Sequence, residues 1–281
     1  MHTGEDTANY LAKGYRVIAF EANHALVKAN RARFSSEIAS GRLTIVEGAI
    51  VAREEGREGV VTFFRHPNAT VWGTVAANWA ERKCKRGELI VETKVPTVDF
   101  PSELHRHGIP YYLKIDIEGR DIYCLSALRE TAGLPSYLSM EAGVGGQDWS
   151  YVHRHLRLLK EVGYDRFLLV KQFKVTTLRE PISTRQGRYG GWNFAQGDTG
   201  MFGTDLAGQW HGYRTTYFLY LVHFYSYRWL GYNTDMKRNF LQKVIRRVIY
   251  KTFNIMMPGW LDTHATTAGH IEAIRRRSAG N

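Results

Sequence analysis

The segment Tyr112-Leu-Lys-Ile-Asp-Ile-Glu-Gly119 places two carboxylates at the end of a short apolar run. The run predicts a buried strand, with Asp116 and Glu118 at its carboxyl end. In an open α/β sheet, ligands bind outside the carboxyl ends of the strands. A carboxylate in that place is costly unless a polar or cationic group meets it. The segment therefore predicts a binding or catalytic site, and the simplest alternative is a solvated acidic turn.

Three further predicted strands also finish on an acid. The strand at residues 16–20 is followed by Glu21, the strand at 43–46 by Glu47-Gly48-Ala49, and the strand at 136–140 by Glu141. Because the carboxyl ends of parallel strands meet at one edge of a sheet, we expect these acids to gather there.

Helical and strand patterns alternate along the first 177 residues, which predicts an α/β fold with a mostly parallel sheet. Capping residues and terminating glycines predict where the helices begin and end. The predicted helices are 5–13 (capped by Thr3 and Asp6), 24–40 (capped by Asn23), a short helix from Asp99 to Gly108, 120–131, and about fifteen residues between Asp148 and Gly163. Strands or a hairpin are predicted within 59–95, and residues 166–173 are the last clear strand.

The second part of the chain, residues 178–281, has a different composition. Residues 187–212 hold eight glycines among many aromatic residues. This mixture predicts either a mobile loop that closes over a substrate or a packed irregular loop. Residues 217–229 predict a buried apolar helix or strand, and residues 238–253 predict a basic amphipathic helix.

Net charge and cysteine content narrow the classes of protein. The formal charge is +11, and residues 237–277 alone carry nine Lys or Arg against Asp262 and Glu272. This basic segment predicts either contact with an anionic polymer or membrane surface, or a solvated helix face. Two scattered cysteines argue against disulfides and a zinc site, so no metal is predicted. No signal pattern precedes the fold, which predicts a cytoplasmic protein. No nucleic-acid module is evident, and the sequence does not indicate an oligomeric state.

Glu21 suggests which ligand the predicted edge binds. A carboxylate after the second strand of a doubly wound sheet commonly accepts hydrogen bonds from both hydroxyls of a ribose. A role at the start of the following helix is the alternative. No G-x-G-x-x-G fingerprint lies upstream, where Gly4 stands alone. A nucleoside without phosphates, such as S-adenosylmethionine, therefore fits better than the dinucleotide of an NAD-linked sugar enzyme.

Three segments together resemble the FkbM family of S-adenosylmethionine-dependent methyltransferases. The resemblance extends in order and spacing from about Met1 to Gly163, and its most specific part is Leu113-Lys-Ile-Asp-Ile-Glu-Gly119. The other two segments are Gly4-Glu-Asp-Thr-Ala-Asn-Tyr-Leu-Ala-Lys-Gly-Tyr-Arg-Val-Ile-Ala-Phe-Glu-Ala-Asn23 and Val95-Pro-Thr-Val-Asp99.

The resemblance implies a class I Rossmann-like methyltransferase that acts on a hydroxyl of a sugar, glycan or other natural product. By this analogy Gly4 approaches the methionine part of the cofactor, and Asp116 lies near the reacting centre. Glu21 holds the ribose with Ala22 beside it, and Glu47, Gly48 and Ala49 border the adenine. A base must take the hydroxyl proton, and the candidates are Asp116, Glu118, Glu141 and one of the histidines.

The chain departs from the family in one respect: it lacks the central first strand, which would precede Met1. Without it the strands before Glu21 and Asp116 lack a shared neighbour. The two explanations are a chain that starts too late and a natural loss of cofactor binding. We therefore expect the 281-residue chain to bind the cofactor weakly or not at all, and an extended chain to bind it. The expected units are a Rossmann-like domain at 1–177 and an α-rich aromatic and basic extension at 178–281. The alternative function is a non-catalytic protein that docks through the basic segment.

Overall fold

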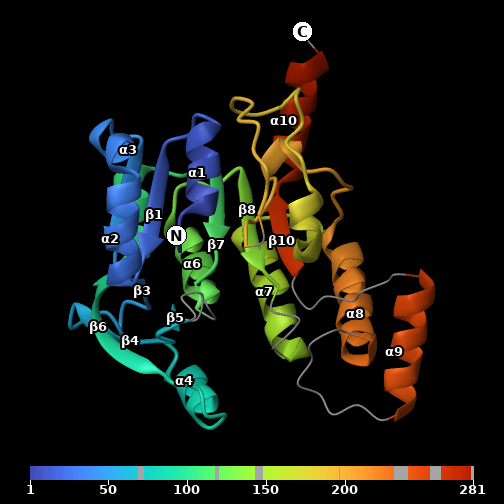
Figure 1. Ribbon diagram of the computed structural model, residues 1–281. Helices are drawn as coiled ribbons and strands as arrows, with labels where there is room; N and C mark the ends of the chain where they lie inside the picture. The colour runs from blue at the N-terminus through green and yellow to red at the C-terminus, as the bar shows by residue number, and fades with distance from the viewer. Residues whose placement is uncertain are drawn as a thin grey trace.

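The computed structural model describes residues 1–68, 73–117, 120–142, 148–195, 197–230, 240–253 and 261–279. Within these residues, helices and strands are interspersed up to β9 (Figure 1). The helices are α1 Glu5–Ala12, α2 His24–Arg33, α3 Ser35–Ala39, α4 Ala77–Cys84, α5 Phe100–His107, α6 Asp121–Ala127, α7 Trp149–Val162, α8 Tyr213–Leu230, α9 Phe240–Phe253 and α10 Ala268–Ala279, with 3-10 turns η1 Leu128–Glu130, η2 Gln172–Thr177 and η3 Gly203–Asp205. The strands are β1 Val17–Glu21, β2 Leu43–Glu47, β3 Ala49–Ile50, β4 Val60–Arg65, β5 Gly73–Thr74, β6 Val91–Val98, β7 Tyr112–Ile115, β8 Tyr137–Glu141, β9 Arg166–Lys171 and β10 Leu261–Thr266.

The strands form three sheets. The first is the parallel pair β1-β2, and the second has the order β7-β8-β10-β9. In the second sheet β7 and β8 are parallel, whereas β10 runs antiparallel to both β8 and β9. The third sheet, β3-β6-β4-β5, contains the strands predicted within 59–95, of which β4 and β6 pair antiparallel, and it lies at the far end from α10 (Figure 1). The chain therefore has a mixed α/β fold.

The main hydrophobic core lies around the β7-β8-β10-β9 sheet. Leu125, Leu138, Phe167 and Ala265 are completely buried in it and come from α6, β8, β9 and β10. Such burial contributes about 1.5–3 kcal/mol for a large apolar side chain. The C-terminal strand β10 thus shares one core with the strands that precede residue 177.

Several local predictions are confirmed. The side chain of Asn23 accepts a hydrogen bond from Ala25 N at the start of α2, and Asp148 accepts one from Tyr151 N at the start of α7. Helix α7 ends at Gly163, and α5 ends at Gly108. Residues 217–229 form part of α8.

Other local predictions are wrong. The predicted helix 24–40 is broken at Phe34, a buried side chain whose backbone leaves helical geometry. Helix α1 is not capped by Thr3 and Asp6. Its N-cap is Gly4, which has no side chain to cap the helix, and the Asp6 carboxylate accepts bonds from Lys114 and Thr199 instead. Residues 166–173 are not the last strand, because β10 follows and inserts between β8 and β9.

The strands β1 and β7 belong to different sheets. In the part of the chain that the structure describes, β1 pairs with β2 and β7 pairs with β8, and β1 and β7 do not pair with each other. Their arrowheads point to the same end of the molecule, where the N-terminus lies between them (Figure 1). The predicted loss of a central strand stays a prediction. Separately, none of the described helices is both long and apolar enough to cross a membrane.

Candidate active site

Three carboxylates from neighbouring strands meet at one end of the β7-β8-β10-β9 sheet. Asp116 directly follows β7, and Glu141 is the last residue of the parallel strand β8. Strand β10 runs the opposite way, so its beginning lies beside the end of β8, and Asp262 is the register partner of Glu141. An antiparallel neighbour therefore brings an acid from a distant part of the chain to the carboxyl edge of the parallel strands.

Asp262 is buried in this group and is 6% exposed. Its Oδ2 accepts a hydrogen bond from Gln172 Nε2 at 2.6 Å, and the same amide nitrogen also donates to Thr199 O. Burial raises the pKa of Asp262 to about 8, and the nearby carboxylates Asp116 and Glu141 add to the rise against the opposing charge of Lys114. Asp262 can therefore hold a proton near neutral pH.

Glu141 is less enclosed than Asp262. Burial is the largest cause that raises its pKa, to about 7, and the negative charges of Asp116 and Asp121 raise it further. A carboxyl group with a pKa near the working pH can both take up and release a proton, which is the property of a general base. Glu141 has this property among the predicted catalytic residues.

Lys114 connects these acids to helix α1. Its Nζ lies 2.7 Å from Asp6 Oδ2 and 3.4 Å from Asp116 Oδ2. Burial disfavours the charged ammonium, but the two carboxylates outweigh this and raise the pKa of Lys114 above its usual value. Asp6 also accepts bonds from the backbone N–H and hydroxyl of Thr199. Lys114 thus supplies the cation that a carboxylate at this edge needs.

On the β1-β2 side, Glu21 and Glu47 are register partners at the ends of their strands. Glu21 Oε2 accepts bonds from the Met1 ammonium at 3.1 Å and from His2 N at 2.8 Å, while Oε1 accepts from Asn23 N at 2.9 Å. A carboxylate has about four acceptor positions. One position on Oε1 is therefore left for a ligand hydroxyl.

Glu47 and the residue after it, Gly48, are held in place by their neighbours. Glu47 itself is paired with His24 at 2.6 Å and Arg31 at 3.0 Å, and the hydrogen bond from His24 is the main cause that lowers the pKa of Glu47. Gly48 donates its N–H to Glu21 O and has a φ of 144°. A Cβ there would lie 2.8 Å from Pro96 O, so only glycine fits.

The remaining predicted cofactor residues have packing roles. Gly4 has a φ of 90°, and a Cβ would lie 2.6 Å from Asn30 Oδ1, so packing on α2 alone requires glycine. Ala49 is buried, and Ala22 packs against its cluster. Glu118 lies outside the described residues. The other predicted residues form two groups, one at the end of β1 and β2 and one at the end of β7 and β8, at the same end of the molecule (Figure 1).

Comparison with protein families decides the assignment. The family description "Methyltransferase FkbM domain" matches residues 1–166, which is more than half of the chain. The chain belongs to the FkbM methyltransferase family. No curated protein and no solved structure shows a significant match.

The match contains every described residue of the predicted FkbM site but not Asp262 or Gln172. Sequence reasoning missed both. The segment Leu261-Asp-Thr-His-Ala-Thr266 lacks the apolar pattern of a strand, although all six residues are buried. Its only signal is the β-branched threonines. Lys114 was visible within the FkbM segment, but its pairing with Asp6 was not.

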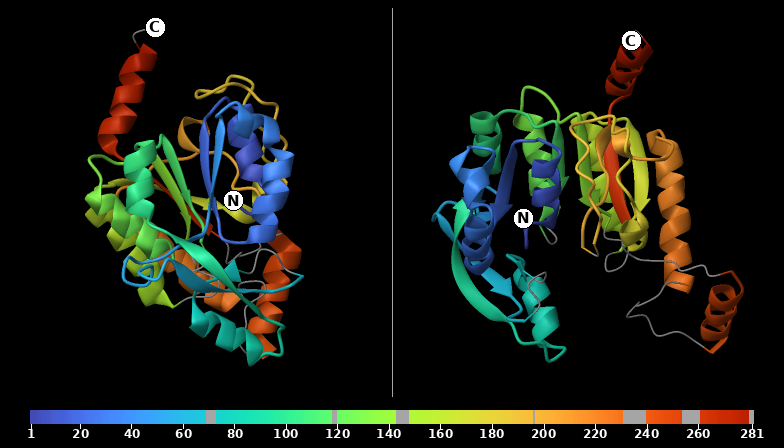
Figure 2. Two further views of the ribbon diagram at one scale, coloured as in Figure 1. Left: turned by 90° about the vertical axis from the view of Figure 1, so that its left-hand side faces the viewer. Right: turned by 45° about the horizontal axis from the view of Figure 1, so that its top comes forward.

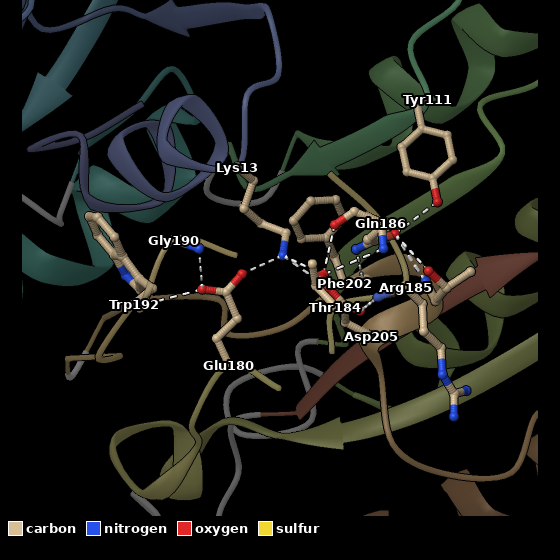
Figure 3. Close-up of polar contacts among 11 residues, drawn as sticks. Lys13, Tyr111, Glu180, Thr184, Arg185, Gln186, Gly190, Trp192, Phe202 and Asp205 are labelled. Carbon is tan, nitrogen blue, oxygen red and sulfur yellow. Dashed lines mark hydrogen bonds and ion pairs between the residues drawn. The ribbon is translucent and has the colours of Figure 1, made fainter. Parts of the chain in front are cut away.

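The FkbM domain is fastened to the following segment by a buried ion group. Lys13 Nζ lies 2.6 Å from Glu180 Oε1 and 3.0 Å from Asp205 Oδ2 (Figure 3). Glu180 also accepts bonds from the N–H groups of Gly190 and Trp192, and Asp205 accepts from Thr184 and Arg185. These members lie within 180–205. The glycine-rich segment is therefore packed on α1, as in the second of the two alternatives that its sequence allowed.

Proposed function

We propose that this chain is an S-adenosylmethionine-dependent methyltransferase that transfers a methyl group to a hydroxyl of a sugar or related natural product. The observation that carries the proposal is the set of carboxylates at the ends of β1, β7 and β8 in a chain of the FkbM family. The two separate parallel pairs would be parts of one doubly wound sheet, and the class I Rossmann-like arrangement belongs to this proposal.

The residues present fit the adenosine part of the cofactor. Glu21 keeps one acceptor position for a ribose hydroxyl, and its carboxylate is oriented by three nitrogen donors. Ala22, which is only partly buried, offers a small apolar side chain beside it. A second ribose hydroxyl would have to replace the Met1 ammonium on Oε2.

When bound, S-adenosylmethionine supplies an electrophilic methyl group on a sulfonium. The protein must place the acceptor oxygen in line with that methyl group and remove the hydroxyl proton. Glu141 takes this proton, because its carboxyl is more accessible than that of Asp262 and has a pKa of about 7. The negative charges of Asp116 and Asp121 increase the affinity of Glu141 for this proton. Lys114 holds Asp116 in place.

Ligand-observed saturation-transfer NMR with S-adenosylhomocysteine tests the cofactor part of the proposal, because it detects weak binding. We expect transfer to the ribose and adenine protons in the 281-residue chain, and its loss in Glu21→Ala. Glu58→Ala is the matched control, since Glu58 is exposed. Absence of transfer at millimolar ligand, or an equal signal in Glu21→Ala, would overturn the proposal.

A second experiment tests the assignment of Glu141 as the general base. Glu141→Gln should keep the saturation-transfer signal, because the proposal assigns the adenosine to Glu21 and only the acceptor proton to Glu141. On an acceptor found by a mass gain of one methyl group, it should lower kcat by about 10²–10⁴-fold. Wild-type kcat should rise with pH through about 7, as the Glu141 carboxyl loses its proton. A variant with normal kcat would remove Glu141 from the mechanism.

A further inference from the structure

Helix α8 carries a row of apolar side chains that the protein leaves exposed. Phe218, Val222, Tyr225 and Trp229 are each about half exposed or more, and they recur at intervals of three and four residues. On an α-helix this spacing places them on one stripe. The opposite face, with Tyr220, packs in the main core. Two faces of α8 are thus apolar, and only one of them is covered.

Helix α9 also carries a row of apolar side chains, and two of them are more exposed than most of those on α8. Phe240 is 82% exposed and Leu241 63%, and Val244 and Val248 continue the same stripe at 41% and 54%. Helix α9 lies next to α8 on the side away from the sheet (Figure 1, Figure 2). Monomeric soluble proteins seldom expose a large apolar patch unless it serves an interaction.

The charges of α9 indicate the chemistry of the partner. Lys243, Arg247 and Lys251 are exposed and follow each other at intervals of four residues. With about 100° per residue, they run along the border of the apolar stripe and end within it. Neither α8 nor α9 contains an aspartate or glutamate. Within the described residues, no acidic side chain pairs with these three lysines and arginines. The surface thus combines apolar and cationic groups.

We propose that α8 and α9 form a docking surface for an anionic phospholipid membrane. The apolar stripe would enter the boundary between headgroups and acyl chains, and the cations would meet lipid phosphates and carboxylates. An anionic polymer would satisfy the cations but would leave the aliphatic side chains in water. The proposal places the protein on a membrane surface and is independent of the methyl-transfer chemistry.

Vesicle flotation of the full chain tests this surface. We expect binding to vesicles of phosphatidylcholine with phosphatidylserine, weaker binding to phosphatidylcholine alone, and loss of binding at high salt. Lys243→Glu/Arg247→Glu/Lys251→Glu should weaken binding by at least about a hundredfold, from roughly fivefold for each cation removed and more for each charge reversed. Phe240→Ser/Leu241→Ser should also lower binding, and by a similar factor at each salt concentration at which the wild type still binds.

The matched control is Arg275→Glu/Arg276→Glu, an exposed basic pair on α10 outside the proposed surface, which should bind like the wild type. All variants should keep the saturation-transfer signal of S-adenosylhomocysteine, so failure of this proposal is distinguishable from failure of the catalytic one. Equal binding of the α9 variants and the wild type would overturn the proposal. Binding of RNA or of a second copy of the chain to the α8–α9 surface, without binding to vesicles, would also overturn it.

Discussion

Among the described residues, Asp262 and Glu141 are the carboxyl groups whose environment departs most from water. Asp262 is almost completely buried, and its Oδ2 accepts a hydrogen bond from the amide of Gln172 rather than from a cation. A buried carboxyl without a close counter-charge is more stable when protonated. Lys114 lowers the pKa of both groups, but burial and the neighbouring acids have the larger effect.

The difference in pKa between the folded and the unfolded chain predicts how stability depends on pH. The unfolded chain releases these protons near pH 4, whereas the folded chain keeps them to about pH 7 for Glu141 and 8 for Asp262. Their contribution to the free energy of unfolding is therefore present at low pH and is lost as pH rises through that window. The slope is at most about 1.4 kcal/mol per pH unit for each group.

Asp262→Asn removes one of the two groups while the side-chain oxygen can still accept from Gln172. Urea unfolding at several pH values should therefore show a shallower fall between pH 5 and 8 than in the wild type, and higher stability at pH 8. Glu58→Gln, an exposed substitution, should leave the slope unchanged. Parallel curves for Asp262→Asn and the wild type would mean that Asp262 is already ionised at neutral pH.

The sequence predicts part of this residue-level arrangement. Asp116 and Glu141 were placed at strand ends because short apolar runs stop directly before them. Asp262 could not be found this way, since its position depends on a pairing across more than a hundred residues. The donors to Glu21 were also invisible, because they come from backbone N–H groups, the N-terminus among them, whose direction no residue type encodes.

Among the elements, α1 and the segment 180–205 depend on each other through Lys13. The ammonium is 4% exposed and lies between two buried carboxylates, each of which also accepts backbone N–H bonds. All three groups have lost their water, so each depends on the others for compensation. The ring of Phe202 also stacks on that of Tyr112, with 4.4 Å between the ring centroids, so the segment contacts β7 as well as α1.

Lys13→Met would leave two buried carboxylates without their cation. We expect a loss of about 3–5 kcal/mol in the free energy of unfolding, measured with urea. Lys28→Met, on the exposed side of α2, should change it by no more than about 0.5 kcal/mol. Lys13→Met/Glu180→Gln/Asp205→Asn should recover part of the loss, because the uncompensated charges are gone. No recovery would show that shape rather than charge fixes the segment.

Elements with local signals were predictable, and elements defined by tertiary contacts were not. Asn23, Asp148 and Gly163 mark helix ends by hydrogen bonds or backbone geometry that belong to their own residue types. The break at Phe34 has no such mark, since neither proline nor glycine stands there. Likewise, residues 187–212 could be either mobile or packed until Glu180, Asp205 and Lys13 were seen together.

For the whole molecule, the FkbM match and the folded unit do not coincide. The match ends at residue 166, where β9 begins, yet β10 from beyond residue 260 pairs with both β8 and β9. Helix α8 covers the same core from the side. A sheet whose middle strand comes from the end of the chain cannot be completed until that end is present.

A chain that stops after Thr177 tests this dependence. It would expose the facing edges of β8 and β9 and the core surface beneath α8, and unpaired edges of this kind favour aggregation. Because a domain has only about 5–15 kcal/mol of stability in total, we expect no cooperative thermal transition and an aggregated product by size-exclusion chromatography. A chain that stops after Ile274 keeps β10 and the start of α10, where His270 packs edge-on to Tyr137, and should unfold like the full chain. A monomeric, cooperatively unfolding 1–177 fragment would instead establish the FkbM segment as an independent domain, with the rest of the chain as an accessory.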